Sequence, residues 1–411
     1  MSALTNAVMN SFVNVSANSS VNVSAPKAGR VDVFCDLRGT RYFVGKLAHF
    51  GKSIYFEYNQ DFLSSGIELS PFKLPLQSGI FENKECGPGG LFGLFNDSLP
   101  EDWGKALLGS GSHDKILRLD EISPVQRLAM VGASGRGALE YVAQIPKFNS
   151  KTSDFMKCGG LAEDVRRILQ EAECPLDSLN ELFRSRGASR GGKPTLPVDV
   201  CEDSAEVLPV GAGEVGSSPW LIKFHSREGG RDQGLVEYMY SLMAKDAGVE
   251  MPETRLFSSK TTGGFFGVAR FDRDRGQKVH VQTACGLLHA DRYQASLSYE
   301  HLIKLTKVLT GDVREVEKMI RLMVFNVKAG NLDDHSRKFS FLLDSQNHWK
   351  MAPACDLLPA VGFGGKHVTK VNGKCMGITN ADLMAAASVA DIKSSLVREV
   401  ILRTEETFSS F

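Results

Sequence analysis

The sequence contains no long apolar run, no paired cysteines and no excess of either charge. No segment approaches the roughly twenty apolar residues needed to cross a bilayer, so no membrane partner is expected. Lysine plus arginine equal aspartate plus glutamate at 48 each, which argues against a protein whose whole surface binds nucleic acid. Local basic patches are compatible with this balance. The eight cysteines form no Cys-x-x-Cys pair and no Cys/His cluster, so they indicate neither a structural zinc site nor a disulfide framework. Reduced thiols in a cytoplasmic protein are the plain interpretation.

The amino-terminal stretch also lacks the features of a secretion signal. Residues 1–30 are rich in Ser, Asn, Val and Ala, without a basic start or a compact apolar core. They are expected to be a disordered extension, with an edge strand as the alternative because their valines alternate with polar residues. Beyond them, a chain of 411 residues exceeds a typical domain, so two or more subdomains with sizeable cores are expected.

Short strands dominate the region from residue 31. Residues 31–37, 41–47 and 53–58 are rich in β-branched and aromatic side chains, and a tight turn around Gly39 separates the first two. This pattern indicates a small β-rich subdomain over residues 31–145.

An amphipathic helix precedes the most informative stretch of the sequence. From Asp312 onward, apolar residues recur at intervals of three and four, and Glu315 is placed as in a capping box. Gly330 ends the pattern. Asp333 and His335 are therefore expected in a loop beyond the helix, where side chains that do chemistry are often held.

A β-hairpin is predicted directly after this loop. Residues 339–343 and 349–353 flank a polar turn, and a hairpin brings its two ends together, so Asp356 is expected near Asp333. Phosphoryl transfer needs one acid near the acceptor hydroxyl and a second that holds Mg²⁺ near the phosphates. The alternative is that Asp333 and Asp334 only decorate a turn, where aspartate is common.

A glycine-rich basic loop lies upstream, over residues 187–195. Backbone N–H groups in this loop, which contains Ser189, Gly191, Gly192 and Lys193, could cradle phosphate oxygens. The loop matches neither the Walker pattern nor the dinucleotide-binding pattern, so a flexible surface loop is the alternative.

A lysine and a glutamate follow in the order that protein kinases use to hold the α- and β-phosphates. Residues 219–224 are expected to form a short buried strand that carries Lys223. A helix with Glu237 on its surface is expected next. Its apolar side would consist of Leu235, Val236, Met239, Leu242 and Met243. The alternative is that Lys223 reaches solvent from a strand end, as structural lysines often do.

Together these segments resemble the HipA toxins, the serine/threonine kinases of bacterial toxin–antitoxin pairs. The resemblance lies, in the order of the family, in residues 94–104, 129–139, 269–273, 280–285, 298–300 and 325–335. It implies an α+β fold, in which the N-terminal subdomain precedes a kinase-like core with a mostly helical C-terminal lobe, and it implies ATP and Mg²⁺ as cofactors. The core would span residues 146–411, with a phosphate loop at 187–195, a catalytic loop at 325–340 and a metal segment at 352–357.

The resemblance assigns roles to single residues. Asp333 would be the catalytic base, and His335 would orient its loop by hydrogen bonding rather than transfer a proton. Asp356 would bind Mg²⁺, and Lys223 would grip the ATP phosphates with Glu237 as its partner.

The phosphate loop would contain a regulated serine. Ser189 would be the position that family members autophosphorylate, and about two added negative charges in a loop that cradles phosphates should repel nucleotide. Gly191, Gly192 and Lys193 would complete the nucleotide contacts. One residue is missing between Gly192 and Lys193 relative to the family pattern, which puts the contact of Lys193 in question.

Lys338 is a larger departure from the family pattern. The family motif Asp-x-His-x-Lys-Asn has at this position an asparagine that helps hold Mg²⁺, and a protonated lysine cannot coordinate a cation. Either the protein works with one metal ion and the Lys338 ammonium supplies the charge of the second, or phosphoryl transfer is impaired. The presence of Asp333, Asp356 and Lys223 favours the first interpretation, and a drifted variant is a third.

Two functions from different classes follow. The first is a protein serine/threonine kinase toxin that transfers the ATP γ-phosphate to a protein hydroxyl, with aminoacyl-tRNA synthetases as the substrate class that the resemblance suggests. The second is a catalytically weak or inactive subunit that acts as a co-repressor bound to a small helix-turn-helix antitoxin (HipB-like). The antitoxin would then contact the DNA, and the neutral net charge of the chain fits such an indirect role.

Overall fold

The structure is a computed structural model whose described part begins at Gly29. It comprises residues 29–83, 90–99, 123–143, 195–203, 207–210, 216–224, 232–259, 263–290, 297–360 and 362–411. Most of the expected extension (residues 1–28) and the phosphate-loop residues Ser189, Gly191, Gly192 and Lys193 lie outside these ranges. Among the described helices, none combines the length and the apolar character required to span a membrane.

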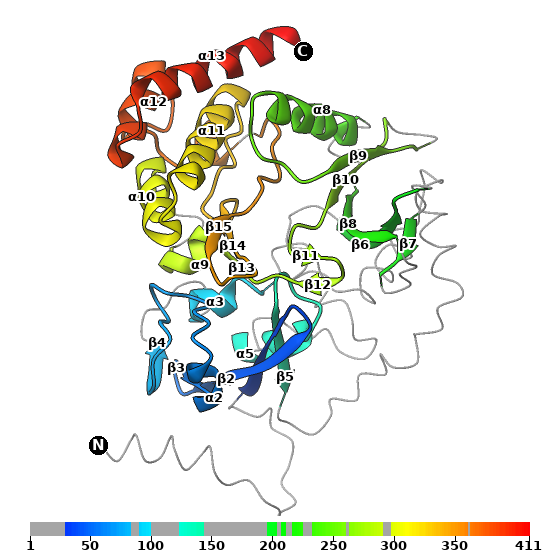
Figure 1. Ribbon diagram of the computed structural model, residues 1–411, viewed down its shortest axis with the longest axis vertical. Coiled ribbons are helices and arrows are strands. Elements are labelled where there is room, and N and C mark those ends of the chain that lie inside the picture. The colour runs from blue at the N-terminus through cyan, green and yellow to red at the C-terminus, as the bar shows by residue number, and fades with distance from the viewer. Residues whose placement is uncertain are drawn as a thin grey trace, which may run out of the picture.

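The N-terminal subdomain is built on one antiparallel sheet, which lies at the lower end of the molecule in Figure 1. Its strands, in the spatial order β4-β3-β2-β1-β5, are β1 (Gly29–Leu37), β2 (Thr40–Phe50), β3 (Ser53–Tyr58), β4 (Ile80–Asn83) and β5 (Leu139–Ala143). Buried and half-buried side chains alternate along β1, so one face of the sheet packs on the core of the subdomain. The helices α2 (Gln60–Ser64) and α5 (Pro124–Val131) contact this sheet. The three strands predicted from residue 31 onward correspond to β1, β2 and β3.

A second antiparallel sheet carries Lys223. Its strands, in the spatial order β7-β6-β8-β10-β9, are β6 (Thr195–Cys201), β7 (Val207–Pro209), β8 (Ser217–Lys223), β9 (Thr254–Phe257) and β10 (Phe265–Ala269). Helix α8 (Gln233–Asp246) packs on β9 and β10, as the green elements of Figure 1 show.

Helix α8 turns a different side toward this sheet from the one predicted. Leu235 and Val236, expected on its apolar side, are 37% and 40% exposed, whereas Glu237 is buried. The helix lies so close to β10 that a Cβ atom on Gly234 would stand 2.1 Å from the backbone oxygen of Gly264. The residues of α8 that are buried at successive turns include Gly234, Glu237, Ser241 and Ala244. The prediction that Glu237 lies on the helix surface is therefore wrong.

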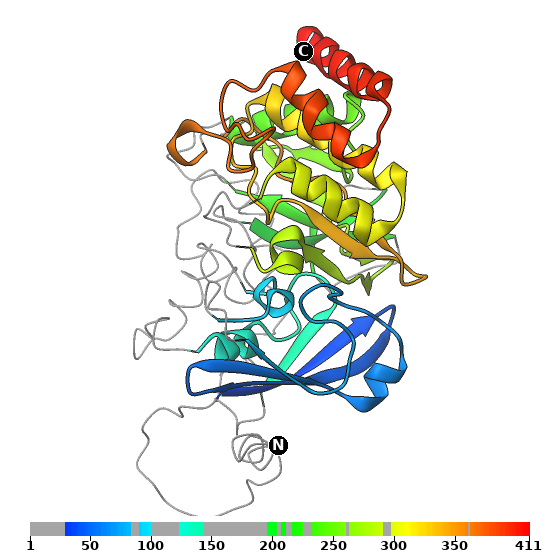
Figure 2. The ribbon, with the colours of Figure 1, turned by 90° about the vertical axis from the view of Figure 1, so that its left-hand side faces the viewer.

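The remaining elements include a three-stranded sheet of order β13-β14-β15, which α9, α10 and α11 contact. The strands are β13 (Val281–Thr283), β14 (Ser340–Leu343) and β15 (Trp349–Met351), with a small hairpin of β11 (Arg273–Asp274) and β12 (Gln277–Lys278) before them. The helices are α3 (Gly93–Asn96), α9 (Ala284–Leu288), α10 (Tyr299–Thr310), α11 (Val313–Ala329), α12 (Asn380–Ala387) and α13 (Ser394–Ser410), with short 3₁₀ turns at η4 (Phe363–Gly365) and η5 (Ser388–Ala390). Figure 2 shows that the N-terminal sheet and the C-terminal helices α12 and α13 lie at opposite ends of the long axis. The α+β fold predicted from the sequence is confirmed.

Helix α11 is the amphipathic helix that the sequence predicts. The side chain of Asp312 caps its start by accepting from the backbone N–H of Arg314, and Gly330 ends it with a φ of 66°. Glu315 does not close the expected capping box. Its buried carboxylate instead accepts a hydrogen bond of 2.7 Å from the backbone N–H of Met351, which fixes β15 against the first turn of the helix.

Candidate active site

Lys223 is the last residue of β8, the middle strand of the second sheet. Its ammonium contacts the carboxylate of Glu237 on α8 and lies 2.6 Å from Oδ1 of Asp356. The Glu237 side chain is 1% exposed and that of Lys223 is 13% exposed, so water screens this ion pair only weakly. Lys223 therefore does not reach into solvent from a strand end.

Asp333 lies in the loop beyond α11, where it was predicted. Gly330 adopts the left-handed conformation that glycine takes at little cost, and this turns the chain out of the helix. Asn331 ties the loop back to the helix, because its Nδ2 donates to Oδ1 of Asn326 at 2.9 Å. The Asp333 side chain stays 47% exposed, and His335 Nε2 lies 3.9 Å from its Oδ1, beyond hydrogen-bond distance. Asp333 is thus the accessible acid of this loop.

The predicted hairpin, formed by β14 and β15, returns the chain to this loop. Asp356 follows it with a φ of 64°, a conformation that non-glycine residues seldom adopt outside turns and functional sites. The Lys338 ammonium contacts Oδ2 of Asp356 and lies 3.4 Å from Oδ2 of Asp333. Asp333 and Asp356 therefore flank one ammonium group, and the predicted proximity of these two acids is found.

Five side chains thus form one line of alternating charge. In order they are Glu237, Lys223, Asp356, Lys338 and Asp333. The line begins on α8, crosses β8 and the segment after β15, and ends in the loop after α11. It gathers all the predicted site residues of the described ranges, with His335 beside its end. Three carboxylates face two ammonium groups, so one negative charge is in excess.

Asp334, which the sequence suggested as a turn residue, is the enclosed acid of the loop. It is 0% exposed, and its Oδ1 accepts from the backbone N–H groups of Val368 and Thr369 at 2.9 and 3.1 Å. Its Oδ2 accepts from the Tyr299 hydroxyl at 3.0 Å and lies 2.9 Å from Nδ1 of His367. Burial and the charge of Asp334 raise the pKa of Tyr299 well above its ordinary value, which keeps the phenol a hydrogen-bond donor. Asp334 therefore fixes the loop to the segment that follows Asp356.

The N-terminal subdomain contacts the same loop. Arg337 Nη2 donates to the backbone oxygen of Asn96 at 3.0 Å, at the end of α3. Next to it, Asp97 accepts two hydrogen bonds from Thr283, at 2.6 Å from the backbone N–H and 2.8 Å from the hydroxyl. The two contacts link the loop after α11 and the start of α9 to the same turn of the N-terminal subdomain.

Within the described ranges, Asp356 is the acid predicted to hold Mg²⁺, and its surroundings decide which ions it can bind. Within the described ranges, no group of three or more His, Cys, Asp or Glu side chains is placed to hold a metal. Each Asp356 oxygen contacts an ammonium, yet a carboxylate has lone pairs for more than two partners. Between Asp356 and Asp333, where a second ion would need an oxygen ligand, stands the Lys338 ammonium. Asp356 is therefore the residue that would hold a Mg²⁺ ion, and the ion would have to share its oxygens with the two ammonium groups.

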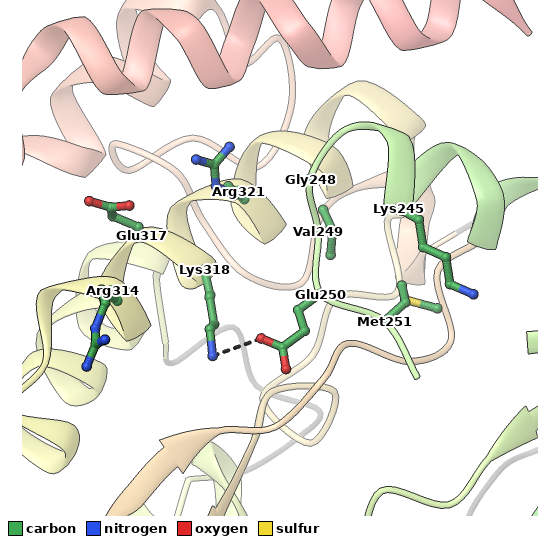
Figure 3. A pocket seen from close by; sticks show the side chains of 9 residues that line it. All are labelled: Lys245, Gly248, Val249, Glu250, Met251, Arg314, Glu317, Lys318 and Arg321. Carbon is green, nitrogen blue, oxygen red and sulfur yellow. Dashed lines mark ion pairs between the residues drawn. The ribbon is translucent and has the colours of Figure 1, made fainter. Parts of the chain in front are cut away.

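A surface cavity lies apart from this line of charges, between α11 and the turn that follows α8. Its volume is about 460 Å³, and it is lined by Lys245, Gly248, Val249, Glu250, Met251, Arg314, Glu317, Lys318 and Arg321. Figure 3 shows Lys318 of α11 and Glu250 of the turn after α8 pointing toward one another. The Lys318 ammonium lies 2.8 Å from Oε2 of Glu250. The backbone oxygen of Glu250 accepts from the N–H of Ala354 at 2.8 Å, so the cavity adjoins the segment that leads to Asp356 without including it.

Kinase-like sites are built from a strand lysine paired with a helix glutamate and from two separate acids. Family models match on both sides of this site. The model for the HipA N-terminal domain matches residues 36–142, and that for the HipA-like C-terminal domain matches residues 191–410. The chain belongs to the HipA family.

Individual relatives are distant in sequence. "Putative kinase Y4dM" of Sinorhizobium fredii (strain NBRC 101917 / NGR234) is 23% identical over 222 residues, which cover 49% of this chain and 53% of that protein. "Putative kinase Y4mE" of the same organism is 24% identical over 313 residues, which cover 71% and 68%. The chain thus spans about half the length of the first of these relatives.

A solved structure shares the fold. A chain of the Shewanella oneidensis MR-1 complex of HipA, HipB and operator DNA superposes with a TM-score of 0.63, covering 93% of this chain and 91% of that one. The sequence identity is 16%, so this likeness concerns the fold alone.

Proposed function

We propose that the chain is an ATP-dependent protein serine/threonine kinase of a HipA-type toxin–antitoxin pair. The observation that carries the proposal is the double contact of Lys223, which meets Glu237 on one side and Asp356 on the other. In protein kinases a lysine held by a helix glutamate binds the ATP phosphates, while separate acids serve the acceptor hydroxyl and the metal. The kinase names of the distant relatives support the same class of reaction.

In the proposed reaction, Lys223 binds the α- and β-phosphates and Glu237 fixes its ammonium. Asp333 accepts the proton of a serine or threonine hydroxyl as the hydroxyl oxygen bonds to the γ-phosphorus. The bond from the γ-phosphorus to the bridging oxygen of the leaving ADP breaks, so the products are a phosphoester, ADP and a proton on Asp333. His335 orients the loop that holds Asp333. Mg²⁺, when bound at Asp356, offsets the charge of the phosphates.

The phosphate loop remains part of the proposal. Gly191, Gly192 and Lys193 would contact the nucleotide, and Ser189 would be the site of autophosphorylation. Phosphate on Ser189 would act as an off-switch, because added negative charge repels the nucleotide phosphates.

The partners belong to the proposal as well. A HipB-like helix-turn-helix antitoxin is the expected binding partner, because the solved neighbour is a complex of HipA with HipB and operator DNA. The chain would contact DNA only through that antitoxin. The proposed location of the protein is the cytoplasm. A protein hydroxyl is the acceptor, and aminoacyl-tRNA synthetases are the substrate class to test first.

The experiment is a search for phosphate on the protein itself. The purified chain is incubated with Mg²⁺ and ATP, and phosphopeptides are located by mass spectrometry. Phosphate on Ser189 in the unsubstituted chain, absent in Asp333→Asn, is the expected result. No phosphate anywhere, with ATP binding intact, would overturn the proposal of a working kinase.

A co-repressor with little kinase activity is the second candidate. The observation that favours it is the contact of Lys338 with Asp356, which places a cation against the metal-binding acid. A gel-shift assay with operator DNA, run with and without the antitoxin, separates the two functions when Asp333→Asn is included. DNA binding that depends on the antitoxin, together with no phosphoryl transfer by the unsubstituted chain, would support the co-repressor.

A further inference from the structure

Lys338 holds a defined place between the two acids of the candidate site. Its backbone N–H donates to the oxygen of His335 at 2.8 Å, which fixes the turn that carries it. Its ammonium then reaches Oδ2 of Asp356 and comes within 3.4 Å of Oδ2 of Asp333, and the side chain is 22% exposed. Structural lysines often extend into solvent, whereas this ammonium lies between two carboxylates. The attraction between opposite charges therefore holds the side chain in place.

The charge of this ammonium decides what else the site can hold. In protein kinases two divalent ions bridge the phosphates and neutralise the charge that develops during transfer. Here the ammonium already neutralises one charge between Asp356 and Asp333. A divalent ion in the same place would be repelled by the lysine and would lack an oxygen ligand from residue 338.

We propose that Lys338 is a tethered cation that replaces one of two metal ions, so that the nucleotide complex of this protein holds a single divalent ion. The proposal rests on the proposed kinase function and specifies how that site meets the nucleotide. Lys223 and Lys338 contact opposite oxygens of Asp356, so both ammonium groups are available to phosphate oxygens that enter beside this acid. Nucleotide binding should therefore depend less on divalent ions than binding to a site with an asparagine at position 338.

The first test counts ions. Mn²⁺ is titrated into the complete chain with a non-hydrolysable ATP analogue, and bound Mn²⁺ is counted by electron paramagnetic resonance. One ion per nucleotide is expected for the unsubstituted chain and two for Lys338→Asn, which removes the charge and supplies an oxygen. Lys338→Met removes the charge without supplying a ligand, so it should still bind one ion.

The second test measures nucleotide affinity by calorimetry in EDTA, without divalent ions. Lys338→Met is expected to weaken the affinity about tenfold, the loss of one charge-assisted contact. Lys350→Asn is the matched control, because Lys350 belongs to β15 of the same hairpin and pairs with Asp344, at 52% exposure. It should change neither the ion count nor the affinity, and thermal unfolding checks that each variant is folded.

Two results would overturn the inference while leaving the kinase function in place. They are two bound ions in the unsubstituted chain, or one ion in Lys338→Asn, each together with phosphoryl transfer by the unsubstituted chain. Failure of the unsubstituted chain to bind the analogue under any condition would instead overturn the proposed function on which the inference rests.

Discussion

Asp334 Oδ2 and His367 Nδ1 lie 2.9 Å apart, both in buried side chains, and this pair joins the candidate catalytic loop to the segment beyond Asp356. Asp334 also accepts from two backbone N–H groups of that segment and from the Tyr299 hydroxyl. Tyr299 in turn accepts from Nδ2 of Asn326 on α11. The position of Asp333 is thus set by the buried acid that follows it.

Asp334→Asn should therefore destabilise the protein strongly. The substitution replaces one acceptor oxygen of the carboxylate by an NH₂ group, whose hydrogens would face groups that are themselves hydrogen-bond donors. It also removes the negative charge that strengthens the remaining hydrogen bonds. We expect the free energy of unfolding to fall by roughly 2–4 kcal/mol, measured by urea denaturation. Asp391→Asn is the control, because Asp391 forms an ion pair with Lys307 at 88% exposure and its loss should not be measurable. Equal effects of the two substitutions would contradict this role of Asp334.

Local sequence patterns predicted the parts of the site that neighbouring residues determine. The apolar spacing from Asp312 and the glycine at 330 predicted α11 and its end. Because the two strands of the hairpin are adjacent in sequence, the return of Asp356 to the vicinity of Asp333 followed from the hairpin alone. The family resemblance added the roles proposed for these residues and for Lys338.

Local sequence patterns did not predict contacts between segments that are far apart in the chain. Glu237 is buried where α8 packs on β10 and pairs with Lys223 of β8, and nothing in the sequence of the helix indicates these contacts. Glu315 was expected to cap its own helix, but Met351 is the donor that it meets. The donors to Asp334 likewise come from positions far along the chain, so its neighbours in sequence suggested only a turn.

Gly93→Ala should loosen the N-terminal subdomain from the core. A Cβ atom at this position would stand 1.9 Å from the backbone oxygen of Gly286 on α9, and backbone cannot yield as a side chain can. We expect a loss of about 1–3 kcal/mol in the free energy of unfolding, measured by denaturation. Under the proposed kinase function, autophosphorylation should fall as well, because Arg337 of the loop contacts Asn96 at the end of α3.

The matched control for this substitution is Gly135→Ala. The nearest atom to its new methyl group is Cγ1 of Val131, at 3.2 Å, and this side chain can shift by a few tenths of an ångström. Gly135→Ala should therefore leave both stability and activity close to those of the unsubstituted chain. If the two variants behave alike, close packing of α3 on α9 does not hold the subdomain in place.

Acid should destabilise the protein through His280. Burial lowers the pKa of His280 from 6.5 to about 4, and its Nε2 lies 2.9 Å from the backbone oxygen of Leu69 in the N-terminal subdomain. Between these two values the unfolded chain binds a proton that the folded chain does not, so the unfolding free energy falls as the pH falls. This group alone should account for a loss of about 3 kcal/mol from pH 7 to pH 4.

His280→Gln isolates that contribution, since glutamine does not titrate. Urea denaturation at several pH values should give a shallower decline below pH 6.5 for His280→Gln than for the unsubstituted chain. His348→Gln, at a histidine that is 70% exposed, should keep the full decline. A parallel decline in His280→Gln would show that other groups carry the acid sensitivity.

Glu237→Gln should impair nucleotide handling while the protein stays folded. Glutamine keeps the size of the side chain but removes the charge that fixes the Lys223 ammonium. Asp356 is then the remaining ion-pair partner of Lys223 among these residues. We expect nucleotide affinity to weaken about tenfold, measured by calorimetry, because a charge-assisted contact is lost. Glu253→Gln is the control, since Glu253 pairs with Arg255 at 58% exposure, away from the line of charges.

The sharpest comparison is the double substitution with Lys223→Met. If Glu237 acts through Lys223, adding Glu237→Gln to Lys223→Met should weaken binding little further, whereas independent roles would make the two losses multiply.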